Sequence, residues 1–171
     1  MEYEIVEVKD LDKKLKRLYE RGQEAASQKN LAYAVEMFRE LLKREPGALG
    51  VRQRMRELMI TRLGEPTFIH RLITNLIALP MFFLNMALLK KKDDASLIKA
   101  LDNGERMMAV DCTAMVPIIM MDRAAYELDL PEVCIQTLEW GLQFYPKSTF
   151  LWDRLGEAYT NAGLGTKALA V

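Results

Sequence analysis

The chain has 171 residues, half of them hydrophobic, and its 24 lysines and arginines are balanced by 24 aspartates and glutamates. This length allows one domain with a sizeable core, and the neutral balance excludes the basic stripe with which proteins neutralise nucleic-acid phosphates. The acidic N-terminus lacks the apolar segment of a secretory signal, and two cysteines are too few for a disulfide framework. We therefore expect a cytoplasmic protein that does not bind nucleic acid.

The first helices are predicted from residue patterns in the N-terminal third of the chain. Asn30 suits the N-cap of a helix over Leu31–Lys43, whose apolar side chains form one stripe. Apolar residues then recur at helical spacing from Val51 to Leu63, and Gly64-Glu65-Pro66 predicts the end of that helix.

An uncharged stretch of 18 residues follows at Leu72–Leu89, and Lys90–Lys92 come directly after it. As a helix it would be about 27 Å long, slightly less than the apolar core of a bilayer. Three polar side chains and Pro80 inside the stretch argue against a spanning segment, and the buried centre of a helical protein needs a helix of this kind. We expect Pro80 to divide the stretch into two helices packed inside the domain, with Phe82 or Phe83 in the core. The alternative is a membrane-associated assembly or secretion component that is anchored through Leu72–Leu89.

The last third of the chain continues the helical pattern. Asp129 stands just before Pro131, and proline suits the first turn of a helix, here one that runs to Phe144. No segment shows sustained strand alternation. The predicted fold class is all-α.

Two separated segments carry the two halves of a known repeat pattern. The C-terminal segment reads Trp152-x₂-Leu155-Gly156-x₂-Tyr159, with Ala168 nine residues later. The N-terminal segment reads Ala34-x₃-Phe38, followed by Pro46. Together they match the signature W-x₂-L-G-x₂-Y…A-x₃-F…P, and the chain resembles the tetratricopeptide repeat family over nearly its whole length.

The register of the repeat can be followed inside the chain. Gly22 and Ala34 are 12 residues apart, as are Gly156 and Ala168, and small residues there would let two helices of one hairpin approach closely. Steps of 34 residues back from Ala168 reach the small residues Cys134 and Ala100, and Pro146 takes the closing position that Pro46 has in the first unit. The chain then divides into an extension at 1–14, a first repeat at 15–48, a degenerate repeat or helical insertion at 49–80, a divergent repeat at 81–114, a repeat at 115–148 and a truncated one at 149–171.

The resemblance implies a right-handed α-solenoid of stacked antiparallel helix hairpins whose concave groove binds a peptide or helix of a partner protein. The run from Pro131 to Glu139 and the following Tyr145-Pro146 also resemble uncharacterised bacterial members, which adds no activity. The positions that line the groove in this family correspond to Tyr19, Gln23, Asn85, Arg123, Asp153 and Glu157 of this chain. Tyr126 and Asn161, toward the C-terminal end, complete the expected groove. The lysines of the carboxylate clamp in the chaperone-binding subclass are missing, so a chaperone tail is not the expected partner.

Residue patterns for catalysis are missing. His70 is the single histidine and has no partner nearby in the sequence, and neither Cys112 nor Cys134 has a basic activator close to it. No phosphate-binding glycine loop and no zinc pattern is found. We expect no enzyme, no cofactor and no metal, and predict a non-catalytic protein–protein interaction scaffold.

The final repeat stops at Val171, before the aromatic residue and the proline that complete the signature. A second helix this short is expected to leave the apolar side chains of Trp152, Leu155 and Tyr159 uncovered. Because a bare end of a repeat stack attracts further units, we expect either a fragment of a longer protein or self-association through this end.

Overall fold

The computed structural model describes residues 4–64 and 66–170, and this part of the chain contains helices and no strand. The prediction of an all-α protein is therefore confirmed. Glu65, which belongs to the predicted break after Leu63, lies outside the described residues. A short 3₁₀ turn at Val8–Asp10 precedes α1 (Lys13–Ser27), α2 (Leu31–Leu42), α3 (Leu49–Leu63), α4 (Phe68–Leu89), α5 (Asp94–Met108), α6 (Met115–Glu127), α7 (Pro131–Phe144), α8 (Thr149–Asn161) and α9 (Gly165–Ala168).

Helix starts follow from side chains that the sequence supplies. The Asn30 side chain accepts a hydrogen bond from the backbone N–H of Tyr33 at the start of α2, as predicted, and Pro131 stands in the first turn of α7. Asp93 caps α5 in the same way as Asn30 caps α2. The bounds of these helices are thus determined locally.

Four hairpins are closed by turns of the same kind, in which one residue has a left-handed backbone. These residues are Lys29 between α1 and α2, Lys92 between α4 and α5, Asp129 between α6 and α7, and Gly163 between α8 and α9, with φ between 55° and 71°. In three of the turns the next amide donates to a carbonyl five residues earlier, at Ala25, Ala125 and Tyr159. This is the bonding by which a left-handed residue ends a helix and reverses the chain.

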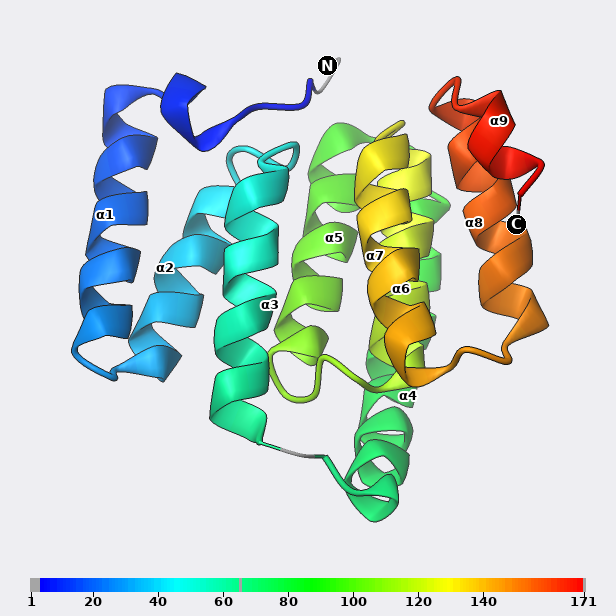
Figure 1. The fold of residues 1–171 in the computed structure, drawn as a ribbon, viewed down its shortest axis with the longest axis horizontal. Helices are drawn as coiled ribbons and strands as arrows, with labels where there is room; N and C mark the ends of the chain where they lie inside the picture. The colour runs from blue at the N-terminus through cyan, green and yellow to red at the C-terminus, as the bar shows by residue number, and fades with distance from the viewer. Residues whose placement is uncertain (1–3, 65, 171) are drawn as a thin grey trace.

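The hairpins lie side by side along the molecule, from α1 at one end to α8 and α9 at the other (Figure 1). Successive hairpins meet where α5 contacts α6 and α7 contacts α8, and α4 also contacts α6. One core of buried aliphatic, methionine and aromatic side chains runs through this row of helices from Leu15 to Tyr159.

Helix α3 is the one long helix outside the hairpin pattern in the described part of the chain. It packs on α2 and reaches across to α7, where the guanidinium of Arg56 donates to the carbonyl of Gln136 and the hydroxyl of Thr137 at 2.9 and 2.8 Å. Burial lowers the pKa of Arg56 to about 10, so it remains charged at neutral pH. Buried arginines therefore tie α3 to helices that lie far away in the sequence.

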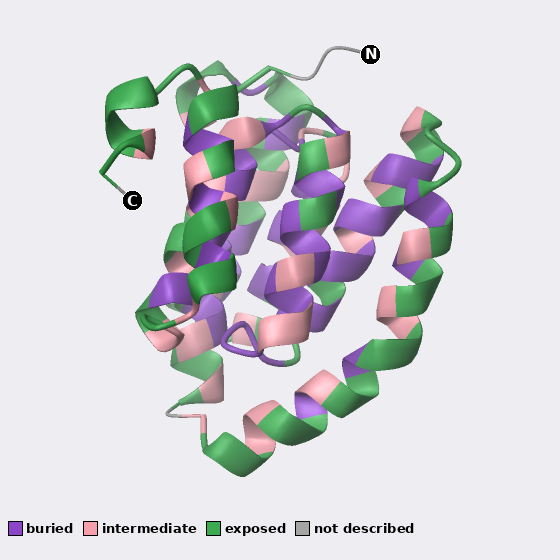
Figure 2. Cartoon of the chain, turned by 90° about the vertical axis from the view of Figure 1, so that its right-hand side faces the viewer, coloured by how far each residue is buried: buried purple, intermediate pink, exposed green. Residues whose placement is uncertain are grey.

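The prediction for Leu72–Leu89 is wrong. The stretch belongs to one continuous helix, α4, with Pro80 inside it, and the predicted division at Pro80 does not occur. Phe82 is only half-buried and Phe83 is 67% exposed, so neither lies in the core. The boundary between units at 80/81 fails for the same reason, since α4 runs through it. Figure 2 shows α4 at the edge of the molecule, curved and largely exposed in its N-terminal half.

The physical reason is the way in which α4 is supported. Proline removes one backbone hydrogen bond and bends a helix without necessarily ending it. Ala78 at the middle of α4 packs against Met107 of α5 and Met120 of α6, while Asn75 and Asn85 on either side of Pro80 form hydrogen bonds to the bundle. The bundle is one helix layer deep on this side, so the other face of α4 has no described neighbour to cover it.

Candidate functional site

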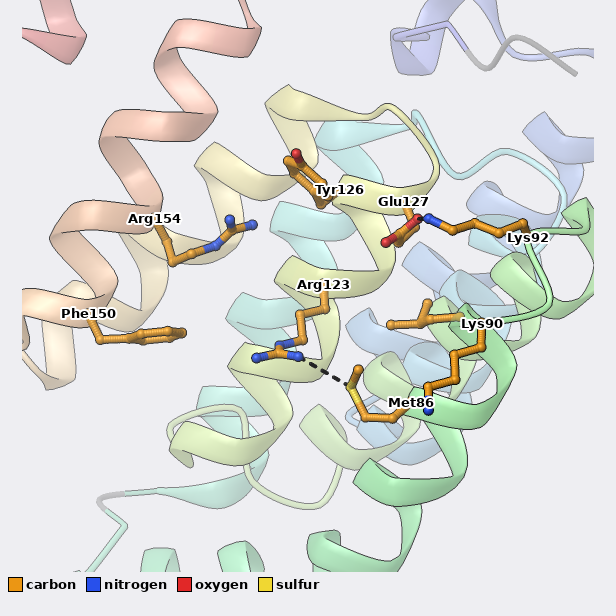
Figure 3. Close-up of a pocket in the computed structure, with 9 residues that line it drawn as sticks. Met86, Lys90, Lys92, Arg123, Tyr126, Glu127, Phe150 and Arg154 are labelled. Atoms are coloured by element: carbon orange, nitrogen blue, oxygen red, sulfur yellow. Dashed lines mark hydrogen bonds and ion pairs between the residues drawn. The ribbon is translucent and has the colours of Figure 1, made fainter.

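The candidate site is a cavity of about 300 Å³ between α4, α6 and α8. Each of these is the first helix of its hairpin, so three consecutive hairpins contribute to one surface. The lining residues are Met86, Leu89 and Lys90 of α4, Lys92 of the following turn, Arg123, Tyr126 and Glu127 of α6, and Phe150 and Arg154 of α8. In Figure 3 the side chains of Phe150 and Arg154 extend from α8 toward α6, opposite Met86 and Lys90.

Arg154 is held in place by partners on α6. Its Nε donates to Oδ2 of the buried Asp122 at 2.8 Å, and its guanidinium lies 5.0 Å from the ring centre of Tyr126. Burial raises the pKa of the Asp122 carboxyl above its ordinary range, and the hydrogen bonds from Arg154 oppose this rise. Arg154 also pairs with Glu157 on its own helix. Most of its charge is therefore used within the protein.

Two other cations at the cavity are not neutralised in this way. Within residues 4–64 and 66–170, neither Lys90 nor Arg123 forms an ion pair. Arg123 instead donates to the sulfur of Met86 at 3.4 Å (Figure 3), and its guanidinium lies over the ring of Phe82. Lys92, by contrast, pairs with Glu127.

The cavity also has an aromatic part. Phe150 and Tyr126 are 41% and 44% exposed, which is high for aromatic side chains beside an open hollow. Together with Leu89 and Met86 they form an apolar wall next to the free cations. The arrangement is suited to a ligand with both an acidic and an apolar group.

The structure brings together only part of the groove set predicted from the sequence. Arg123 and Tyr126 line the cavity. Asp153, Glu157 and Asn161 are exposed on α8 but are not among its lining residues.

The prediction is wrong for Asn85, which faces the interior. It is 2% exposed, and its amide donates to the carbonyl of Ala100 and accepts from Asn103, both at 2.8 Å. Tyr19 and Gln23 lie at the far end of the molecule, where they bond to each other, and Gln23 also accepts from Arg54. They are not part of this cavity.

The sequence prediction missed several lining residues, above all Phe150, Arg154 and Lys90. A usable signal was present, because Phe150 and Arg154 are four residues apart and hence on one helix face. The family resemblance placed the groove at Asp153 instead, one residue before Arg154. A shift of this size turns a helical side chain by about 100° and away from the cavity.

The residues of the repeat signature are buried at helix contacts near the N-terminal end of the chain, and several of them are less deeply buried near the C-terminal end. Gly22, Ala34, Phe38, Pro46, Ala100, Cys134, Leu155 and Tyr159 are buried, whereas Gly156 and Ala168 are half-buried and Pro146 and Trp152 are exposed. The prediction that Gly156 and Ala168 are both buried is wrong, because the four-residue helix α9 covers α8 only partly. The expectation that Leu155 and Tyr159 lie uncovered is also wrong, since α7 packs against α8 from the other side.

A larger cavity of about 490 Å³ lies between α3, α7 and the C-terminal segment. Its lining contains three glutamates, Glu57, Glu132 and Glu139, against the cations Arg56 and Lys167. Arg56 is bonded to α7, and Lys167 lies over the ring of Tyr159. Its charges are therefore of both signs, and both of its cations are engaged within the protein.

His70 has a partner that could not be found from the sequence. Its Nδ1 lies 3.0 Å from Oδ2 of Asp111, which also accepts from the backbone and hydroxyl of Thr113. These contacts fasten the first turn of α4 to the loop between α5 and α6. Among the described residues no cluster of three or more histidine, cysteine or acidic side chains is placed to hold a metal ion.

Both cysteines are buried, and burial raises the pKa of the Cys112 thiol to about 12 and that of Cys134 further still. Thiols of this kind are protonated and poorly nucleophilic at neutral pH.

No protein-family model, curated protein or solved structure matches the chain significantly.

Proposed function

We propose that this protein is a scaffold of the tetratricopeptide type, a right-handed solenoid of helix hairpins, that binds a peptide or helix of a partner protein between α4, α6 and α8. Support for the repeat comes from the four hairpin turns with a left-handed residue and from the signature residues at the helix contacts. In this proposal α3 is an insertion between the first two hairpins, and the protein acts in the cytoplasm without catalysis or cofactor.

The observation that carries the binding proposal is a pair of cations, Lys90 and Arg123, that form no ion pair within residues 4–64 and 66–170 and lie beside the exposed rings of Tyr126 and Phe150. Free positive charges attract and orient an acidic side chain or terminal carboxylate of the partner. The aromatic wall supplies apolar contact area, and aromatic residues lose little conformational entropy on binding. The partner is therefore an acidic segment with at least one large apolar side chain.

Binding at this site would require little rearrangement. Arg154 is already fixed by Asp122 and stacked on Tyr126, and the three helices are held by their own hairpins. A surface arranged before binding loses less ordering entropy than a loop would, so a larger share of the contact energy remains as affinity.

The proposal is tested by fluorescence anisotropy with two sets of labelled peptides that have the same apolar residues and either acidic or basic neighbours. Acidic peptides should bind and basic ones should not, and added salt should weaken binding. Arg123→Glu and Lys90→Glu should each weaken binding about fivefold or more, since an exposed ion pair contributes about 1 kcal/mol.

Lys99→Glu is the matched control, because Lys99 is an exposed lysine on α5 outside the cavity, and it should leave binding unchanged. Equal affinity for acidic and basic peptides, or equal effects of all three substitutions, would show that the cavity is not the binding site.

A further inference from the structure

The outward face of α4 is apolar along its whole length. Ile69, Leu72, Leu76, Leu79 and Phe83 are all exposed and are spaced alternately by three and four residues, which places them on one side of the helix. Leu76 is 58% exposed and Phe83 67%. The helix is long and apolar enough to cross a membrane, yet only 28% of its most apolar 18-residue window is buried. A continuous apolar surface of this kind marks an interaction site.

Three polar side chains of α4, those of Thr74, Asn75 and Asn85, face the protein. Thr74 and Asn85 are buried, and Asn75 accepts a hydrogen bond from the backbone N–H of Val116 at 2.8 Å. Helix α4 is therefore reversed relative to an ordinary surface helix: these polar side chains face the protein, and large apolar side chains face outward. The outer medium for which this face is suited is apolar.

Helix α4 and Lys90–Lys92 after it carry only positive formal charges, of which that of Lys92 is paired with Glu127 of α6. Between Pro66 and Lys92 the chain contains no aspartate or glutamate, while Arg71 and Lys90–Lys92 are cationic. The three lysines are exposed at the C-terminal end of the helix. Cations beside a wide apolar face are typical of helices that bind the surface of membranes with anionic lipids.

We propose that α4 docks this protein on the surface of a bilayer that contains anionic lipids. The helix lies in the plane of the interface, with its apolar face in the acyl boundary and its lysines among the headgroups. It does not span the membrane, because its inner face is packed on α5 and α6 through Ala78, Met107 and Met120. At 22 residues it is about 33 Å long, enough to give an extended line of contact.

A second copy of the chain fits this face less well. Two α4 helices placed face to face, in either direction, bring Lys90 and Lys91 against a helix that has no acidic residue to pair with them, while Lys92 is already paired with Glu127 of its own chain. Anionic headgroups supply the missing negative charge. The apolar area and the charge together favour lipid.

The first test is flotation of the full chain with vesicles of phosphatidylcholine mixed with phosphatidylglycerol. The protein should float with these vesicles and bind more weakly to phosphatidylcholine alone. Ile69→Glu and Leu76→Glu should each weaken binding about tenfold or more, since a carboxylate opposes burial in the acyl region. Leu169→Glu is the matched control, because Leu169 is 92% exposed and distant from α4 in the sequence, and it should bind normally. Circular dichroism checks that every variant is folded, which is expected because the substituted side chains are exposed.

A second measurement reports the depth of the face. Both native thiols are buried, whereas Ile77 is exposed. In the variant Ile77→Cys, a thiol-reactive, environment-sensitive dye should therefore label the introduced cysteine alone under native conditions. Its emission should shift to the blue with anionic vesicles and be quenched by brominated lipid, whereas a dye on Leu169→Cys should not respond.

Failure of the wild-type chain to float would overturn the proposal. So would a dimer in sedimentation that Leu76→Glu dissociates while vesicles are not bound, because the face would then belong to a second copy. Retention of the membrane-bound protein after carbonate extraction would overturn the surface orientation, since a helix lying in the interface is released and a spanning one is not. None of the substituted residues lines the cavity between α4, α6 and α8, so peptide binding and membrane docking are tested separately.

Discussion

Arg52 of α3 and Glu105 of α5 form an ion pair 2.6 Å long between Nε and Oε1, and both side chains are almost completely buried. Arg52 also donates to the carbonyl of Pro46 at 2.9 Å. The remaining Nη1 of Arg52 and Oε2 of Glu105 have no hydrogen-bond partner in the described structure. This pair fastens α3 to α5, the second helix of the next hairpin.

Removal of one partner should destabilise the protein strongly. Glu105→Gln leaves the guanidinium of Arg52 buried and uncompensated, and we expect a loss of about 3–5 kcal/mol in the free energy of unfolding by urea. The double variant Arg52→Leu/Glu105→Leu should lose less, because it leaves no buried charge. The exposed pair Arg54–Glu57 is the control, and Glu57→Gln there should change stability by less than about 1 kcal/mol. A double variant less stable than Glu105→Gln would contradict this account.

Two glycines at equivalent places of the repeat signature should respond to alanine with opposite signs. A Cβ at Gly22 would lie 2.8 Å from Cδ1 of Phe38, whereas one at Gly156 would meet nothing closer than the carbonyl oxygen of Ala168 at 4.0 Å. Gly22→Ala should therefore cost about 1–3 kcal/mol by overpacking. Gly156→Ala should stabilise by about 0.5–1 kcal/mol, since alanine is the better helix former. Equal effects in urea unfolding would mean that the two hairpin contacts are equally tight.

Pro80 should weaken the helix that contains it. Pro80→Ala restores an N–H for the carbonyl of Leu76 and removes a steric clash, and we expect a gain of about 1–3 kcal/mol. Pro131→Ala is the matched control, because proline is tolerated at the first turn of α7, and its effect should be close to zero. Loss of stability in Pro80→Ala would indicate that the curvature of α4 is needed for its contacts with α5 and α6.

Tyr159 should make the protein sensitive to alkaline pH. Its hydroxyl donates to Oε1 of Glu139 at 2.6 Å, and this hydrogen bond, with burial, raises the pKa of Tyr159 to about 12. The folded state disfavours the phenolate, so this contribution to stability is complete below about pH 10 and is lost as the pH rises through about 12. Tyr159→Phe should remove this part of the pH dependence of the free energy of unfolding by urea. Tyr33→Phe, which replaces an exposed tyrosine, should leave it unchanged.

A tyrosine titration followed by ultraviolet absorbance provides a second measurement for Tyr159. The latest phenol to ionise in the wild type should be missing in Tyr159→Phe. An unchanged titration curve at high pH would show that the contact with Glu139 does not hold the proton.

Local features of this protein were predictable from its sequence. Asn30 and Pro131 mark helix starts, and the small residues at Gly22, Ala34 and Cys134 mark helix contacts, because each acts through neighbours within one hairpin. The candidate site was predicted only in part. Arg123 and Tyr126 were found, but Asn85 was misplaced, since the side of a helix that faces inward depends on which helices pack against it.

The tertiary structure decided what long-range contacts control. Arg52, Arg56 and His70 contact the side chains of Glu105, Thr137 and Asp111, which lie between 41 and 81 residues away, and no local pattern identifies these partners. The same holds for α4: its composition suits a buried helix or a membrane helix equally well, because composition specifies how apolar a helix is and not how many neighbours it has. Packing on one side only, through Ala78, left the other face of α4 exposed. The sequence by itself thus determined where the helices begin and turn, and the tertiary structure determined which of their faces remain available to a partner.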